Sequence, residues 1–132
     1  MRRVRGWWFV VGGAAVLIAA TFTAHVGAAD VEKGKAIFEQ CAACHSLDGT
    51  GDYDGPTLKG IIGRKAGSLE DYRYSAAMKR SDVTWDATTL DTYVADPQAF
   101  IPGNRMAFAG ITEQAQRADL IAYLAAAGGE SK

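Results

Sequence analysis

Cys41-Ala42-Ala43-Cys44-His45 places two thiols three positions apart and an imidazole directly after the second thiol. This spacing is the attachment motif of a c-type haem, in which the two thiols add to the two vinyl groups of the macrocycle. His45 then stands where it can supply the proximal nitrogen to the iron. The motif therefore predicts one covalently bound haem c, with its iron, to which this short segment makes three bonds.

Three other uses of this segment fit the chain less well. A structural zinc ion needs four ligands, but the chain has two cysteines and its only other histidine is His25, in an apolar N-terminal stretch. A redox dithiol belongs in a βαβ pattern, which the sequence does not show. A disulfide between residues three apart closes a loop too small to stabilise much. Haem attachment is the favoured interpretation.

Residues 1–29 have the pattern of an export leader. Three arginines precede an uncharged run over residues 7–24, and small residues at Gly27-Ala28-Ala29 suit a signal peptidase. We expect a cleaved signal peptide and a soluble periplasmic domain. The alternative is an uncleaved anchor that tethers the domain to the cytoplasmic membrane, because the uncharged run spans about 27 Å as a helix, close to the roughly 30 Å hydrocarbon core.

Residues 30–132 are predicted to form one domain. The leader holds 3 of the 14 basic residues and none of the 15 acidic ones, so this domain is net negative. Nucleic acid is therefore excluded as a partner. A core of this size is small, and a buried haem enlarges its apolar centre. We expect a monomer.

Three helical segments are predicted. Apolar residues recur at helical spacing after Asp30, a good N-cap, and this helix leads into the haem motif. A second helix begins at about Asp86 and ends before the next proline. A third follows Thr112, a candidate N-cap, and ends at Gly128-Gly129. Residues 46–65 are predicted to form a loop. No run of alternating apolar and polar residues is long enough to indicate a sheet, so the expected fold class is all-α.

The iron of such a haem needs a sixth ligand or an open position. Met78 and Met106 are the two methionines of the domain, and a thioether is a suitable ligand. Met106 lies in a loop with Pro102-Gly103, which can hold a side chain rigidly. Met78 follows Ala76-Ala77, which can form a short helical turn. From these residues alone, either methionine can be the ligand or fill the core.

Further segments accompany the haem motif in an order that a known family shares. They are Asp30 to Phe38, Gly55-Pro56-Thr57-Leu58, Gly63-Arg64-Lys65, Thr84-Trp85, Tyr93, Pro97, Ile101 to Gly110 and Asp119 to Leu124. With these segments, the chain from Asp30 to about Ala127 resembles the class I cytochromes c, most closely the mitochondrial proteins and their bacterial relatives. The resemblance implies the small all-α fold of that family, wrapped around one haem.

The resemblance also implies a role for each matching position. Cys41 and Cys44 would form the thioethers, while His45 and Met106 would bind the iron on its two sides. The carbonyl of Pro56 would accept a hydrogen bond from the other ring nitrogen of His45. The remaining implied haem contacts are Arg64, Tyr74, Trp85 and Asn104 at the propionates and Tyr93 near the methionine sulfur.

The chain departs from the family in ways that bear on its partners. Mitochondrial members have a basic ring around the exposed haem edge, of which Arg105 alone keeps a positive charge here. The other matching positions are neutral or acidic: Gln40, Tyr53, Gln98, Ala99, Thr112 and Glu113. Met78 stands where the family commonly has an amide in a buried polar network, and a thioether cannot donate a hydrogen bond. We expect little charge steering by that ring.

A haem with histidine and methionine on its two sides predicts an electron carrier and not an enzyme. The soft thioether favours ferrous iron and raises the reduction potential. We expect the protein to shuttle single electrons from a quinol-oxidising complex or a dehydrogenase to an oxidase, a reductase or a photosynthetic centre. The alternatives are a peroxidase-like enzyme, which needs an open sixth position, and a haem sensor module, which needs a coupled domain.

Overall fold

The computed structural model describes residues 28–49 and 54–129 of the chain. Those residues form five helices and no strand: α1 (Val31–Phe38), α2 (Ala76–Arg80), α3 (Ala87–Ala95), α4 (Pro97–Phe100) and α5 (Gln114–Gly128). The all-α prediction is confirmed for this part of the chain. Across the same ranges, no helix has the length and apolar character needed to cross a membrane. Of the leader predicted over residues 1–29, residues 1–27 lie outside the described residues. Tyr53, one of the positions that match the basic ring, also lies outside them.

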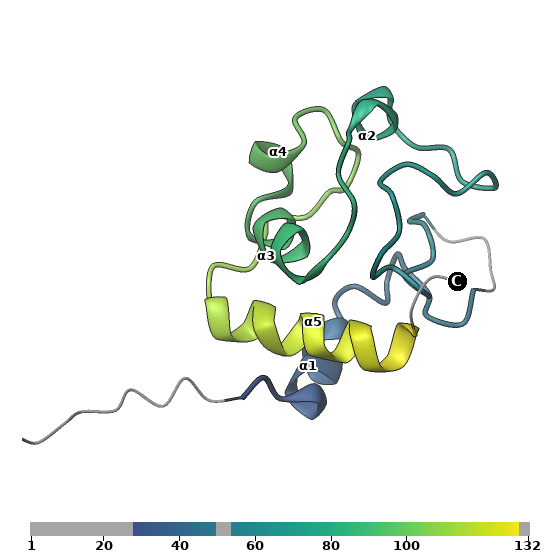
Figure 1. Ribbon diagram of the computed structural model, residues 1–132. Coiled ribbons are helices and arrows are strands. Elements are labelled where there is room, and N and C mark those ends of the chain that lie inside the picture. The colour runs from purple at the N-terminus through teal and green to yellow at the C-terminus, as the bar shows by residue number, and fades with distance from the viewer. Residues whose placement is uncertain (1–27, 50–53, 130–132) are drawn as a thin grey trace, which may run out of the picture.

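The first and last helices cross at a glycine. α1 and α5 lie against each other at one end of the molecule, with α2 at the other end (Figure 1). A Cβ atom at Gly34 would collide with the carbonyl of Asp119, so only a residue without a side chain allows this approach. The rings of Phe38 and Tyr123 meet beside it at 5.4 Å between centroids. The missing side chain at Gly34 therefore lets the two terminal helices pack closely.

Two of the three predicted helix starts are confirmed by their caps. The carboxylate of Asp30 accepts the backbone N–H groups of Glu32 and Lys33 at 3.0 and 3.1 Å. Asp86 and Thr89 form a reciprocal capping box at the start of α3, with both N···O distances at 2.8 Å. α3 then ends before a proline that is the first residue of α4, a position where a missing N–H costs nothing.

The predicted start of α5 is wrong. Thr112 does not cap this helix: Glu113 takes the N-cap position and makes no side-chain cap bond. The carbonyl of Thr112 instead accepts a hydrogen bond from the Arg117 guanidinium at 2.8 Å. Because that bond and a second one to Ile111 hold the preceding backbone, the chain enters the helix one residue later. The C-terminal end at Gly128-Gly129 agrees with the prediction.

A short antiparallel contact closes the loop region over the core. Three backbone hydrogen bonds of 2.7 to 2.9 Å join residues 63–66 to residues 83–85. The contact contains a single isolated bridge, between Lys65 and Thr84, so the expectation of no sheet is confirmed for the described residues. The pairing sets Arg64 against Trp85, whose ring is buried in the core with Leu90, Leu120 and Leu124. Two predicted haem contacts that are far apart in sequence thus become neighbours.

Candidate haem site

The two cysteines lie in a turn that continues from α1. The backbone N–H groups of Cys44 and His45 both donate to the Cys41 carbonyl, at 3.0 and 2.9 Å. Both thiols are free, with Cys41 half-buried and Cys44 exposed. Burial raises the pKa of the Cys41 thiol to about 11, so this sulfur stays protonated in the folded protein. Neither thiol is consumed by a disulfide, and both are available for addition to a vinyl group.

His45 is held by the hydrogen bond that the resemblance implied. Its Nδ1 atom lies 2.7 Å from the carbonyl oxygen of Pro56, which can only accept, so Nδ1 carries the hydrogen. Burial lowers the pKa of the imidazole, although the Pro56 carbonyl opposes the shift. A neutral ring with hydrogen on Nδ1 keeps a lone pair on Nε2, which is the form in which histidine binds a metal.

Gly55 shapes the pocket around that imidazole. Its N–H donates to the Cys44 carbonyl at 2.8 Å, which folds the chain back onto the haem motif. A Cβ atom at this position would lie 2.7 Å from Nδ1 of His45 and 2.8 Å from the Cys44 carbonyl oxygen. No side chain larger than hydrogen fits there. No role was predicted for Gly55, and the signal for it was its place in the matching segment Gly55-Pro56-Thr57-Leu58.

Arg64 has a buried nitrogen without a partner. Its Nη2 donates to the Thr57 carbonyl at 2.8 Å and to the Lys59 carbonyl at 3.3 Å, but its Nε is buried and unpaired within the described residues. Burial lowers the pKa of this guanidinium and raises that of the nearby Tyr74 hydroxyl. An orphaned buried N–H is costly and rare. A carboxylate of the haem would satisfy it with a charge-assisted hydrogen bond.

Trp85 and Tyr93 form a buried aromatic wall. Their ring centroids are 4.9 Å apart at an angle of 56°, and Phe100 follows at 6.3 Å from Tyr93. Trp85 is 6% exposed and Tyr93 7%. Burial raises the pKa of Tyr93 to about 12, so its hydroxyl keeps its hydrogen and can donate to a thioether sulfur. The wall is suited to exclude water from one side of a flat cofactor.

Asn104 ties down the start of the loop that carries Met106. Its side-chain amide donates to the carbonyls of Pro97 and Ile101 at 2.7 and 2.9 Å, and its Oδ1 accepts the Met106 N–H at 2.8 Å. Both side-chain N–H groups are therefore engaged with the protein. The implied contact between Asn104 and a propionate needs one of them to be released. In this structure the side chain positions the Met106 backbone.

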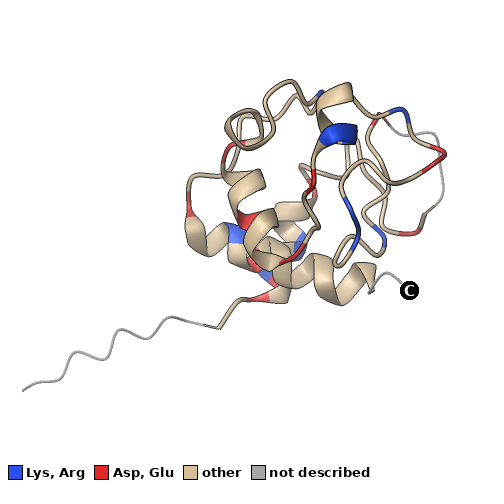
Figure 2. Cartoon of the chain, turned by 45° about the horizontal axis from the view of Figure 1, so that its top comes forward, with Lys and Arg blue, Asp and Glu red and all other residues tan. Residues whose placement is uncertain are grey.

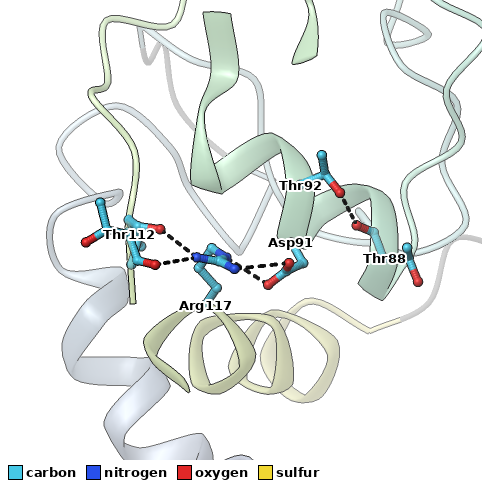
Figure 3. A network of polar contacts seen from close by, with 6 residues as sticks. Thr88, Asp91, Thr92, Thr112 and Arg117 are labelled. Atoms are coloured by element: carbon cyan, nitrogen blue, oxygen red, sulfur yellow. Dashed lines mark hydrogen bonds and ion pairs between the residues drawn. The ribbon is translucent and has the colours of Figure 1, made fainter. Parts of the chain in front are cut away.

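Arg117 ties down the other end of the same loop. Its guanidinium faces the carboxylate of Asp91 with N–O distances of 2.8 and 3.3 Å and donates to the carbonyls of Ile111 and Thr112 (Figure 3). The loop backbone is also bonded to α3, from Ile111 N to Val94 O at 2.8 Å. This network was not predicted from the sequence, because no local pattern links a residue of α3 with one of α5.

The two methionines occupy different settings. Met106 is half-buried in a loop, packed against the core between the two anchors. Met78 is half-buried on α2 and also packs against the core, with its backbone N–H donating to the Ser75 hydroxyl at 3.1 Å. The helical turn expected at Met78 is confirmed.

The described residues fit a covalently attached haem. Two free thiols and a neutral imidazole with an available Nε2 come from one segment, and the fold adds the unpaired buried guanidinium nitrogen of Arg64 from another. Each would bind a different part of the cofactor: the thiols its vinyl groups, the imidazole its iron and the guanidinium its carboxylates. The haem supplies an iron that accepts and returns one electron.

Comparison with known proteins agrees with this geometry. The cytochrome c family profile matches residues 31–127. Cytochrome c2 of Rhodoplanes tepidamans is 45% identical over 104 residues, which cover 78% of this chain and 97% of that protein. Cytochrome c of Sesamum indicum is 45% identical over 97 residues, 72% of this chain and 87% of that one.

A solved structure agrees as well. Cytochrome cH from Methylobacterium extorquens superimposes with a TM-score of 0.69 and 42% identity, covering 74% of this chain and 98% of its own. The fold, the profile and both relatives lead to one assignment. The chain belongs to the cytochrome c family, and its cofactor is covalently bound haem c with iron.

Proposed function

We propose that this protein carries single electrons between redox complexes, with Cys41 and Cys44 bonded to the haem and with His45 and Met106 as the axial ligands. The observation that carries the proposal is the neutral His45 imidazole, fixed by Pro56 beside two free thiols. A ligand held in one orientation changes little when the iron gains or loses an electron, which keeps transfer fast. The carrier function is the one that cytochrome c relatives share.

The surrounding residues each support that role. Trp85 and Tyr93 are buried and would keep water from the haem, which would tune the reduction potential. The unpaired Nε of Arg64 would offset the charge of a propionate. Cys44 is exposed, so a partner could approach the cofactor from the side of this residue.

A filled sixth position favours a carrier over a peroxidase-like enzyme or a haem sensor. Both ends of the Met106 loop are anchored, by Asn104 and by Arg117, so the thioether is held ready for the iron. Azide and cyanide should then bind the ferric protein slowly, because they must first displace Met106. Rapid binding of either anion to the resting protein would favour the enzyme.

We further propose that residues 1–29 export the chain and that residues 30–132 form the carrier domain. The family match from residue 31 supports this boundary. The expected donors are a quinol-oxidising complex or a dehydrogenase, and the expected acceptors are an oxidase, a reductase or a photosynthetic centre. Intact mass of the protein from its native host distinguishes a soluble periplasmic carrier, starting near Asp30, from one anchored by residues 7–24.

Acid–acetone extraction followed by redox cycling tests the central proposal. The haem should stay with the wild-type polypeptide and leave a Cys41→Ser plus Cys44→Ser variant. The wild type should also be reduced by ascorbate and reoxidised by ferricyanide, and the absorption spectra recorded on the way should share isosbestic points. Haem lost from the wild type, or a protein that does not cycle, contradicts the proposal.

A further inference from the structure

One region of the described domain holds more basic than acidic residues. The segment 65–82 together with Arg105 holds five basic and three acidic residues, whereas the rest of the described residues hold five basic and ten acidic ones. Figure 2 shows basic positions on the last turn of α2, whereas the helices at the opposite end carry both acidic and basic positions. This region therefore has a net positive charge, whereas the rest of the described residues has a net negative charge.

Four of these cations come from three segments that touch. Arg105 donates from Nη1 to the carbonyl of Arg73 at 3.1 Å, which joins the Met106 loop to the segment before α2. A Cβ atom at Gly103 would lie 3.5 Å from the Cβ of Ala77, so the same loop also rests against α2. α2 ends with Lys79 and Arg80. We call Arg73, Lys79, Arg80 and Arg105 the α2 cluster.

The cations of the α2 cluster are available to a partner. All four side chains belong to exposed residues, and none of them makes an ion pair within the described ranges. Of the three acidic residues in this region, Asp82 is paired with Lys65 at 3.6 Å. The other two, Glu70 and Asp71, precede the cluster in sequence. They do not balance its four cations, so the region keeps an excess of positive charge.

A shallow hollow of about 310 Å³ lies beside the cluster. Its lining residues are apolar (Ala77, Phe100, Ile101 and Pro102) and polar (Arg80 and Ser81). Protein interfaces likewise combine apolar and polar surface. Pro102 belongs to the loop that carries Met106, so a partner seated in the hollow would contact the loop of the proposed haem ligand.

We propose that the α2 cluster and this hollow form the docking surface for an acidic redox protein that presents carboxylates around a protruding apolar side chain. The inference rests on the proposed carrier function and specifies where its partner binds. It places the electrostatic contact on α2 and Arg73, outside the ring positions that have lost their charge. The mixed charge pattern favours a protein over a membrane. A protein can set its carboxylates opposite the cations alone, whereas a uniformly anionic lipid surface would also face Glu70 and Asp71.

The test compares two variants that lose the same charge at different places. Lys79→Gln plus Arg80→Gln removes two cations from the α2 cluster, and Lys33→Gln plus Lys35→Gln removes two from α1 at the opposite end (Figure 1). The probe is a mitochondrial-type cytochrome c oxidase with an acidic docking site. Stopped-flow oxidation of each reduced holoprotein is measured over a salt series, and binding to vesicles of anionic phospholipid is measured in parallel. Reduction by ascorbate and oxidation by ferricyanide serve as the control of the carrier function.

The α2 variant should react about tenfold more slowly than the wild type at low salt and lose most of the salt dependence. The α1 variant should stay within about threefold of the wild type. Equal loss in both variants would mean that only net charge matters, and no loss in either would leave the cluster without a role; both results overturn the docking surface. Loss of vesicle binding without loss of oxidase reactivity assigns the cluster to a membrane and also overturns it. Failure of the ferricyanide cycle contradicts the carrier function itself.

Discussion

The two sides of the haem site are held in different ways. On the proximal side, which carries His45, the main contacts join residues close in sequence, such as Cys44 to Gly55 and His45 to Pro56. On the distal side, which the proposal assigns to Met106, the end of the loop depends on Arg117 of α5 and a carboxylate of α3 that is 26 residues away. The position of His45 is therefore a local property, while that of Met106 requires three helices in place. Partial unfolding should release Met106 before His45.

The largest expected effect comes from removing the distal ligand. Met106→Ala should abolish the ferric-iron-to-sulfur charge-transfer band and lower the reduction potential, because the soft thioether is lost. Met78→Leu should retain the band, since leucine can fill the same place against the core. Absorption spectra and redox titration of the two variants check this. The opposite pattern would move the ligand to Met78.

Adding a methyl group on the proximal side should lower the unfolding free energy more than adding one on the distal side. In Gly55→Ala, the new methyl group must displace the His45 ring or the Cys44 carbonyl, which should cost about 3 kcal/mol of unfolding free energy. Gly103→Ala adds a methyl group with ordinary contacts, and its positive φ of 86° should cost about 1 kcal/mol. Guanidinium unfolding of both ferric holoproteins measures the difference. Equal losses would mean that Gly55 does not brace the imidazole.

Asn104→Ala tests the near anchor of the distal loop. The change removes the amide bonds to the Pro97 and Ile101 carbonyls, which keep their backbone hydrogen bonds, and leaves the Met106 N–H without its partner, which should cost about 2 kcal/mol. The charge-transfer band should also disappear at a lower denaturant concentration than the helical circular dichroism signal. If the band and the helices are lost together in the variant and in the wild type, the distal side is as firmly held as the proximal side.

The smallest expected effect concerns the far anchor. Asp91→Asn weakens the bidentate pair with Arg117, whose side chain is 12% exposed, and should cost about 1 kcal/mol. The matched control is Asp82→Asn, because the Asp82 side chain is 99% exposed and its pair with Lys65 should contribute almost nothing. Thermal unfolding monitored at the charge-transfer band compares them. A larger shift for Asp82→Asn would remove the argument that burial makes the Arg117 anchor effective.

Much of the fold could be predicted because its signals are local. Asp30 and Asp86 cap helices whose apolar residues follow at helical spacing, and the proline after Asp96 stops one of them. The prediction failed at Thr112, where local capping preference competes with a guanidinium that arrives from the next turn of α5. A hydrogen bond from a side chain several residues away does not appear in any local pattern.

The site was predictable to a similar degree. The spacing of the two cysteines and His45 indicated the haem from residues alone, and the resemblance to a family supplied Pro56. Gly55 and Arg117 were not assigned roles. Gly55 matters because a side chain there would collide with His45, and Arg117 matters because it pairs with a carboxylate far away in sequence. Both effects depend on the three-dimensional structure.

The sequence by itself determined the covalent chemistry of this protein. Thiols and an imidazole at fixed spacing in one segment can reach one macrocycle in any fold that leaves the segment exposed to it. Only the tertiary structure decided what surrounds that chemistry: the unpaired buried Nε of Arg64, the two anchors of the Met106 loop and the gathering of Arg73, Lys79, Arg80 and Arg105 on one side. The physical reason is that burial, electrostatic fields and hydrogen bonds act through space, between side chains that the sequence order keeps apart.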